Sequence, residues 1–166
     1  MKWPQMLLIS ATISLLGGCD WLRQGDTQSV PRSGLVGVWL ITETTRTSPA
    51  GIVVNDQPQP GIYIFTERHF SNILIPNEQR ALFSAIPTDQ ERLAAYDNFI
   101  TDAGTYDATD TTLTTHNFIA KVPNVMTGNP GITYRYNLEG DNLRLTFSGG
   151  WAPRDGEITY RLRRLE

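Results

Sequence analysis

The chain has 166 residues, a formal net charge of −3 and a charged fraction of 19%. This weakly acidic balance excludes the basic surface on which nucleic-acid binding depends. A single cysteine excludes a disulfide framework, and the length suffices for one domain with its own hydrophobic core.

The first eighteen residues have the layout of a secretory signal peptide. Lys2 supplies a positive charge, and residues 6–16 form an apolar stretch that is too short to span a bilayer as a helix. The sequence Leu16-Gly17-Gly18-Cys19 follows directly and resembles the bacterial lipobox. The resemblance implies cleavage after Gly18 and attachment of palmitate-type acyl chains to Cys19.

A lipid on Cys19 would anchor the protein to a membrane without spanning it, because two or more acyl chains bind a bilayer far more firmly than one. The alternative is an ordinary secreted protein whose only cysteine happens to lie there. That alternative leaves a lone exposed thiol in an oxidising compartment.

Residues 19–33 are polar and rich in Gly, Ser and Pro, which predicts a flexible tether. Asp20 follows the lipidated position, and an aspartate there resembles the inner-membrane retention signal of enteric-type lipoproteins. The resemblance favours a periplasm-facing location on the inner membrane of the cell envelope, with the outer membrane as the alternative.

From Gly34 to the end of the chain, short β-like runs alternate with turn residues. Each run is rich in β-branched and aromatic residues and is bounded by Gly, Pro, Asn or Asp. The predicted strands cover residues 35–46, 62–67, 69–75, 103–107, 112–122, 132–138, 142–148 and 157–165.

One segment departs from this pattern, at residues 88–100. Thr88 and Glu91 have capping-box spacing, and Leu93, Tyr96 and Ile100 recur at helical intervals. These features predict one short helix, with an irregular lid loop as the alternative.

The last three predicted strands alternate between an apolar and a polar face. Tyr134, Tyr136 and Leu138 share one face, for example, opposite Arg135 and Asn137. Such alternation in consecutive strands is typical of an antiparallel meander. About eight strands can close into an up-and-down barrel, so we expect an all-β fold over residues 34–166.

Several motifs resemble the bacterial lipocalin-like domain family. That family tends to have an LxGxW first strand, a Y-tp-dG-hys hairpin, an fGTY strand and a GdrLtLt hairpin. The matching segments here are residues 35–39, 64–71, 103–107 and 136–146. The resemblance implies that Gly37 and Trp39 form the signature at one closed end of the barrel. It also implies that Arg164 lies across the tryptophan ring, a structural role that uses cation–π attraction.

A barrel of this size either packs its interior solid or holds one small ligand. Ligand pockets combine apolar walls with a few polar groups, and tyrosine supplies both. The pocket candidates are Tyr106, His116, Phe118, Tyr134, Tyr136, Phe147 and Tyr160. Inward-facing carboxylates at Glu43, Asp102 or Asp107 are compatible with the pattern, but strand parity does not select among them.

Three functional classes follow. The preferred class is a membrane-tethered binding module for a small hydrophobic or amphipathic ligand. The second is an interaction protein with a filled barrel, and the third is an isomerase- or cyclase-type enzyme that uses tyrosines or His116. No nucleophile elbow or metal-ligand spacing is present, so neither a metal nor another cofactor is expected.

Overall fold

The computed structural model describes residues 34–77, 79–126 and 131–166. The expected signal peptide (1–18), Cys19, Asp20 and the tether (19–33) lie outside the described residues.

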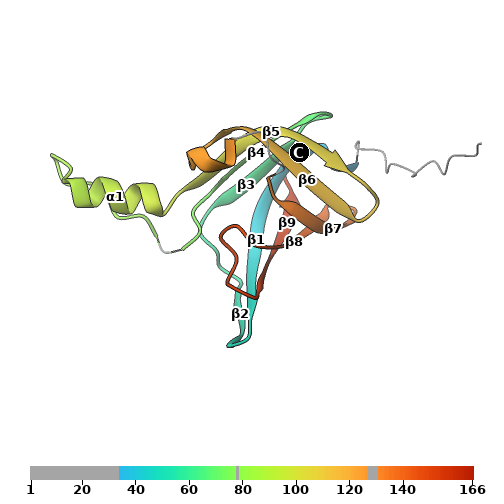
Figure 1. Cartoon of the computed structure of the whole chain (residues 1–166), viewed down its shortest axis with the longest axis horizontal. Coiled ribbons are helices and arrows are strands. Elements are labelled where there is room, and N and C mark those ends of the chain that lie inside the picture. The colour runs from blue at the N-terminus through green and yellow to red at the C-terminus, as the bar shows by residue number, and fades with distance from the viewer. Residues whose placement is uncertain (1–33, 78, 127–130) are drawn as a thin grey trace, which may run out of the picture.

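The described chain forms one nine-stranded antiparallel sheet with a short α-helix (Figure 1). The elements are β1 (Gly37–Ser48), β2 (Gly51–Asn55), β3 (Gly61–Phe65), β4 (His69–Leu74), α1 (Asp89–Asp97), β5 (Ile100–Ala108), β6 (Thr112–Ala120), the 3-10 helix η2 (Pro123–Met126), β7 (Thr133–Glu139), β8 (Asn142–Ser148) and β9 (Glu157–Arg164). From β3 onward each strand pairs with the next, and β9 pairs back with β1. Strands β1 and β3–β9 therefore close an eight-stranded barrel, which confirms the predicted all-β, up-and-down fold.

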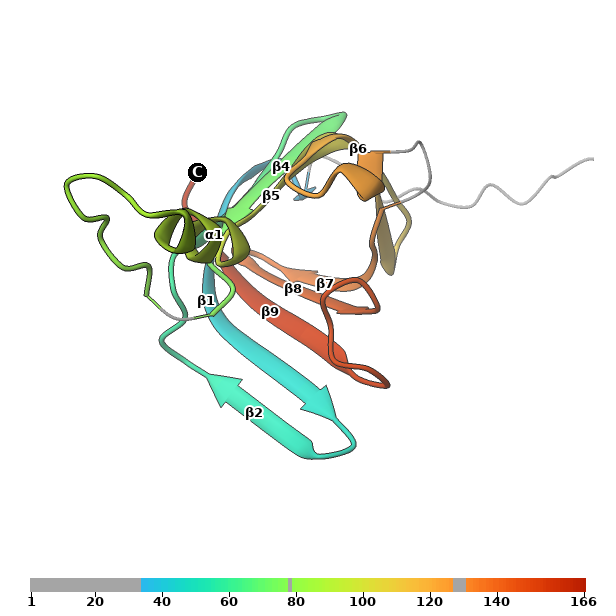
Figure 2. The ribbon, with the colours of Figure 1, turned by 60° about the vertical axis from the view of Figure 1, so that its left-hand side comes forward.

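The two ends of the barrel differ in their connections. Short turns at residues 66–68, 109–111 and 140–141 lie at one end, together with the start of β1 and the end of β9. We call this the closed end. The longer connections, from β4 to β5, from β6 to β7 and from β8 to β9, have their described residues at the opposite end, which we call the open end. Figure 2 shows strands β4–β6 and β7–β9 on opposite sides of the interior.

The closed end is sealed around Trp39. Its ring is fully buried, and its indole N–H donates a 2.8 Å hydrogen bond to the carbonyl of Leu35. The Arg164 guanidinium lies 4.1 Å from the centre of the ring, the contact that the resemblance implies. The same guanidinium donates to the carbonyls of Gly34 and Val36, so it holds the incoming chain across the barrel end.

Gly37 permits this close packing. Its φ of +145° is one that L side chains rarely adopt, and a Cβ there would lie 2.3 Å from the Glu166 carbonyl oxygen. Glycine is therefore required both for the backbone conformation and for the approach of the C-terminal residues.

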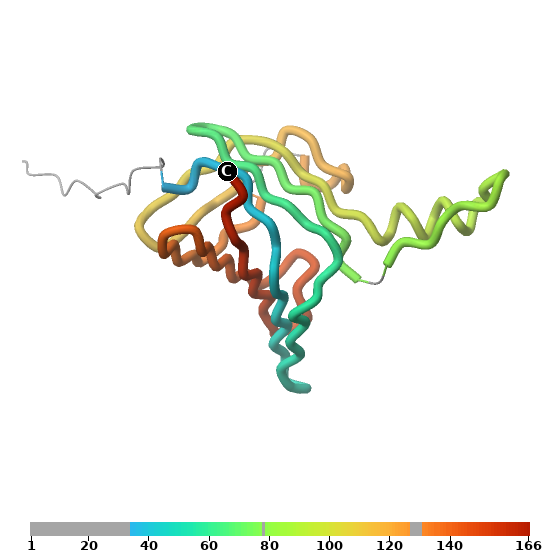
Figure 3. Tube along the Cα trace, turned by 180° about the vertical axis from the view of Figure 1, so that it is seen from behind, coloured from blue at the N-terminus to red at the C-terminus, as the bar shows by residue number. Residues whose placement is uncertain are grey.

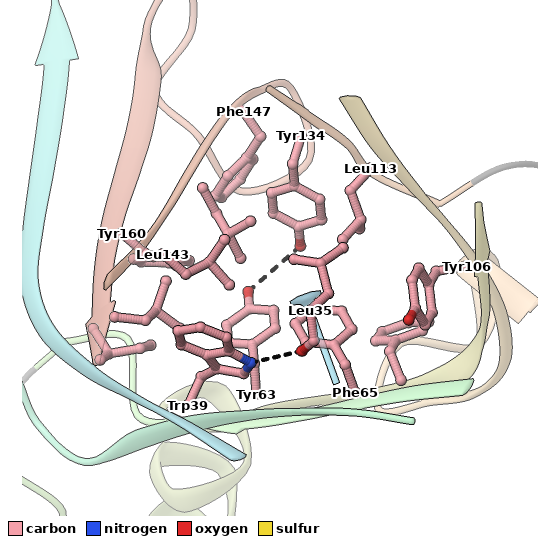
Figure 4. Packing of buried hydrophobic residues seen from close by; sticks show 14 of the residues in the cluster. Leu35, Trp39, Tyr63, Phe65, Tyr106, Leu113, Tyr134, Leu143, Phe147 and Tyr160 are labelled. Atoms are coloured by element: carbon pink, nitrogen blue, oxygen red, sulfur yellow. Dashed lines mark hydrogen bonds between the residues drawn. The ribbon is translucent and has the colours of Figure 1, made fainter. Parts of the chain in front are cut away.

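Apolar side chains fill the interior above the closed end (Figure 4). The buried core consists of Leu35, Trp39, Ile41, Tyr63, Phe65, Phe70, Leu74, Tyr106, Leu113, Tyr134, Leu143, Leu145, Phe147, Ile158, Tyr160 and Leu162. The aromatic rings meet mainly edge to face or tilted, as in the Phe65–Tyr106 pair at 5.2 Å. Within β7–β9, the alternation in the sequence predicts correctly which side chains face the interior.

Strand β2 was not expected. It pairs with the far half of β1, from Thr44↔Asn55 to Ser48↔Gly51, and this hairpin projects beyond the barrel (Figure 2). All five β2 residues are exposed, including Ile52, Val53 and Val54. Because neither face of β2 is buried, no apolar alternation marks the strand in the sequence.

The connection between β4 and β5 forms an arm that extends away from the barrel (Figures 1 and 3). It contains α1, whose N-cap is Thr88 and whose capping box with Glu91 is present as predicted. The helix ends at Asp97, earlier than the predicted Ile100, which begins β5 instead. No residue of α1 is buried, so the predicted apolar spacing does not form a buried helix face.

Candidate functional site

A cavity of about 730 Å³ opens at the open end of the barrel. Its described lining comprises Phe70, Asn72, Asp97, Ile100, Asp102, Thr115, Asn117, Lys121, Val122, Asn124, Val125, Gly131, Ile132, Thr133, Tyr134, Ser148, Gly150 and Trp151. These residues come from β4–β8, the base of the arm, η2 and the β8–β9 connection.

The cavity exists because β6 and β7 separate. Their strand register covers only Thr112–Thr114, whereas β6 remains paired with β5 as far as Ala120. Backbone hydrogen bonds still join the two segments at Thr115, whose amide donates to the Ile132 carbonyl at 3.0 Å and whose carbonyl accepts from the Gly131 amide at 2.6 Å, so the separation lies beyond Thr115. A Cβ at Gly131 would lie 2.6 Å from the Thr115 hydroxyl, so glycine is needed at this approach.

Tyrosines form the floor where the cavity meets the core. Tyr134 is buried, and its hydroxyl lies 3.4 Å from that of Tyr63, as the dashed line in Figure 4 shows. Burial raises the pKa of Tyr63 and the pKa of Tyr134 well above the ordinary value for a phenol. Both phenols are therefore neutral at physiological pH and act as hydrogen-bonding groups.

A polar wall rises on one side of this floor, along β4, β5 and β6. Asn72 is 1% exposed, and its side-chain oxygen accepts a 2.8 Å hydrogen bond from the backbone N–H of Asp102. Burial raises the pKa of the Asp102 carboxyl, and a side-chain hydrogen bond with Asn72 partly offsets the rise. Thr115 and Asn117 continue the wall on β6.

The mouth of the cavity is shaped by contacts between the arm and the segment after β6. The Tyr96 hydroxyl donates a 3.0 Å hydrogen bond to the Lys121 carbonyl, and the Lys121 ammonium lies 4.1 Å from the centre of the Tyr96 ring. The same ammonium donates at 3.5 Å to the Asp97 carbonyl. These contacts hold the base of the arm beside the opening.

Of the seven pocket candidates from the sequence, Tyr134 lines the cavity. Tyr106, Phe147 and Tyr160 lie in the filled core instead; the Tyr106 hydroxyl donates to the Thr66 carbonyl and the Tyr160 hydroxyl accepts from the Trp151 indole. Tyr136 is half-buried and donates to the carbonyl of Thr109 in a turn of the closed end.

The structure corrects the assignment of His116 and Phe118 to the interior. His116 lies on the outer face of β6, where its Nε2 is 3.0 Å from an Asp107 carboxylate oxygen. Phe118 is 59% exposed and contacts the ring of His69. The residues of β6 that face inward are Leu113, Thr115 and Asn117. Regular alternation places these odd-numbered residues of β6 inward, so the even-numbered His116 and Phe118 point outward. The apolar side chain of Phe118 favoured the wrong face, because exposed aromatic residues also occur on strands.

Sequence reasoning did not select most of the residues that line the cavity. The strand pattern is compatible with an inward Asp102 without selecting it, and it does not indicate Asn72, Ile100 or Trp151 as cavity residues. Asn72 alternates with Phe70 and Leu74 on the buried face of β4, which was the available signal. Ile100 was assigned to the helix, and Trp151 lies in a connection whose path the strand pattern does not predict.

Within 34–77, 79–126 and 131–166, no three His, Cys, Asp or Glu side chains gather closely enough to hold a metal ion. Of the helices in these ranges, none combines the length and apolarity needed to cross a bilayer.

No family model, curated protein or solved structure matches this chain. What is inferred about the site therefore depends on its own geometry and chemistry.

Proposed function

We propose that the barrel is a binding module for a small hydrophobic or amphipathic molecule, which enters at the open end. The observation that supports this most strongly is the 730 Å³ cavity above a filled core. Small-molecule sites commonly measure about 300–1,000 Å³ and combine apolar walls with a few placed polar groups.

The composition of the walls supports an apolar ligand body. Ile100, Val122, Val125, Ile132 and Trp151 surround the opening, while the polar side chains gather on the β4–β6 side. Burying a methylene group against such a wall contributes about 0.8 kcal/mol, so each added methylene should tighten binding about fourfold. This gradient should hold until the cavity is filled.

Calorimetric titration of the full-length protein with 1-hexanol, 1-heptanol and 1-octanol tests the proposal. We expect saturable one-to-one binding that tightens along the series. Val122→Trp should weaken it at least tenfold, because the added ring occupies the mouth. Ile119→Trp is the matched control, since Ile119 is 66% exposed and does not line the cavity.

Two outcomes would contradict the proposal. One is the absence of saturable binding for all three alcohols. The other is equal weakening by both tryptophan variants, which would place the alcohols on the outer surface or on the arm.

We further propose that the module is a lipoprotein of the bacterial cell envelope, anchored through Cys19 and facing the periplasm. Gly34, where the described chain begins, is held at the closed end by Arg164. A chain leading to the anchor would therefore leave the barrel at the closed end. The membrane is expected to be the inner one if Asp20 acts as a retention signal.

Fractionation of cells tests the anchor. Cys19→Ser should move the protein from the membrane to the soluble fraction, and Asp20→Ser should shift the wild-type band from inner- to outer-membrane markers. Membrane association of Cys19→Ser after a salt wash would contradict the anchor, and a wild-type band with outer-membrane markers would contradict the inner-membrane location.

The exposed arm favours a second candidate function, in which the barrel presents a surface to another envelope protein. Leu82 is 94% exposed, Ile86 84% and Leu93 60%, and exposed apolar residues that lie close together mark interaction surfaces. If the alcohols fail to bind, this second function becomes the better account of the molecule.

A further inference from the structure

The cavity contains a carboxylate without a cationic partner. Asp102 lies on the inner face of β5, partly buried, and a hydrogen bond with the Asn72 side chain is its described side-chain interaction. Among residues 34–77, 79–126 and 131–166, no basic side chain forms an ion pair with it. A carboxylate removed from water in this way is costly unless a bound group compensates its charge.

The basic residue in the described lining is directed elsewhere. The Lys121 ammonium lies over the Tyr96 ring and donates to the Asp97 carbonyl, at the mouth rather than at the polar wall. It therefore does not neutralise Asp102. The charge of the wall is left negative, and this favours a ligand that brings a positive charge.

A second acceptor lies on the same wall. The side-chain oxygen of Asn117 is buried and has no hydrogen-bond partner among the described residues. Nearly all buried polar atoms in proteins are paired, so an unpaired acceptor beside a ligand cavity is a place for a donor. Asp102 and Asn117 thus present two acceptors on one wall of the cavity.

Resting on the binding function proposed above, we propose that the ligand is an amphipathic amine, whose protonated head lies at the Asp102 carboxylate and whose apolar body lies toward the mouth. An alkyl ammonium resembles a lysine side chain, with a pKa near 10, and is charged at neutral pH. Tyr134 and Trp151 also line the cavity, and aromatic faces attract such cations.

A matched set of eight-carbon probes tests the inference. The full-length protein is titrated calorimetrically at pH 7 with octylamine, 1-octanol and octanoate, which share one tail and differ in head group. We expect octylamine to bind roughly tenfold more tightly than octanol, since a hydrogen-bonded charge pair contributes more than a neutral one. Octanoate should bind most weakly.

Two variants locate the preference. Asp102→Asn should abolish the advantage of the amine over octanol. Asp107→Asn is the control, because it removes the same formal charge from the outer face of β5, where the carboxylate meets His116. It should keep the full preference for the amine. Thermal unfolding verifies that both variants are folded.

The possible results separate this inference from the function on which it rests. Equal binding of the three probes, or an amine preference that survives in Asp102→Asn, would overturn the amine inference and leave the binding function standing. Failure of all three probes to bind would overturn both. An equal loss of preference in Asp107→Asn would show general charge attraction and would also overturn the inference.

Discussion

The two ends of this barrel are built from the same antiparallel strands but differ in how their polar groups are satisfied. At the closed end, Trp39 is fully buried beneath the incoming chain, with Arg164 across its ring. At the open end, another tryptophan, Trp151, is only partly buried and lines a cavity together with the carboxylate of Asp102. The first end satisfies its polar groups with the protein's own backbone, whereas the second leaves polar groups for another molecule to satisfy.

This difference arises from strand pairing. Strands β8 and β9 remain in register along their full lengths, so their inward side chains pack against one another. Strand β6 diverges from the segment before β7 beyond Thr115, and the cavity lies beside this divergence. Stability should therefore depend mainly on the closed end, while changes at the open end should affect binding more than folding.

The largest expected difference is between the two tryptophans. Trp39→Ala should lower the free energy of unfolding by about 3–5 kcal/mol, as expected for a fully buried aromatic. Trp151→Ala should cost only about 1–2 kcal/mol, because its ring is partly exposed and its indole N–H donates to the Tyr160 hydroxyl rather than to a buried backbone group. Urea unfolding measures both, and equal costs would contradict the division into two regions.

A pair of glycines sharpens the account of the closed end. Gly37 and Gly51 have similar positive φ values, +145° and +131°, but a Cβ at Gly51 meets nothing within 4 Å. Both alanine variants carry the conformational strain, whereas Gly37→Ala also collides with the Glu166 carbonyl. We expect Gly37→Ala to be more destabilising by about 1–3 kcal/mol. If urea unfolding gives the same loss for both, the close packing of the C-terminal residues contributes little.

The smallest expected effect is at Asp102. Burial raises the pKa of its carboxyl in the folded protein, so the folded state binds the proton more tightly than the unfolded state. Stability from this group is therefore fully present below its ordinary pKa near 3.8 and is lost as pH rises through the folded pKa. Asp102→Asn should remove this pH dependence and raise the melting temperature at pH 7 by a few degrees at most, because solvent screens the partly exposed charge.

Scanning calorimetry at a series of pH values compares the wild type with Asp102→Asn. A variant that is less stable than the wild type at pH 7 would show that the ionised carboxylate has a stabilising partner in the free protein. That result would remove the reason for expecting a cationic ligand.

The sequence predicted the closed end better than the open end, for a physical reason. Strict alternation in β7–β9 reflects burial of one face, and the resemblance that includes the LxGxW segment implies the contact between Trp39 and Arg164 that the structure shows. The capping box of α1 could also be predicted from the sequence, because the residues that form it lie within four positions of one another.

The open end depends on features that do not follow a regular period. A bulge opposite Ala103 and Gly104 shifts the register between β5 and β6, and the divergence of β6 from β7 is a property of pairing between distant segments. Asp102 and Asn72 meet across β4 and β5, which are separated by the arm. No local pattern predicts such a meeting.

The most direct test of the central claim is an NMR titration of the methyl-labelled full-length protein with 1-octanol. The cavity at the open end should show saturable shifts at the methyl groups of Ile100, Val122 and Ile132. The methyls of Leu143 and Leu162, in the filled part of the core, should remain unchanged. Shifts confined to Leu82, Ile86 and Leu93 on the arm, or no saturable shift at any methyl, would contradict the claim that the open end of this barrel holds the ligand.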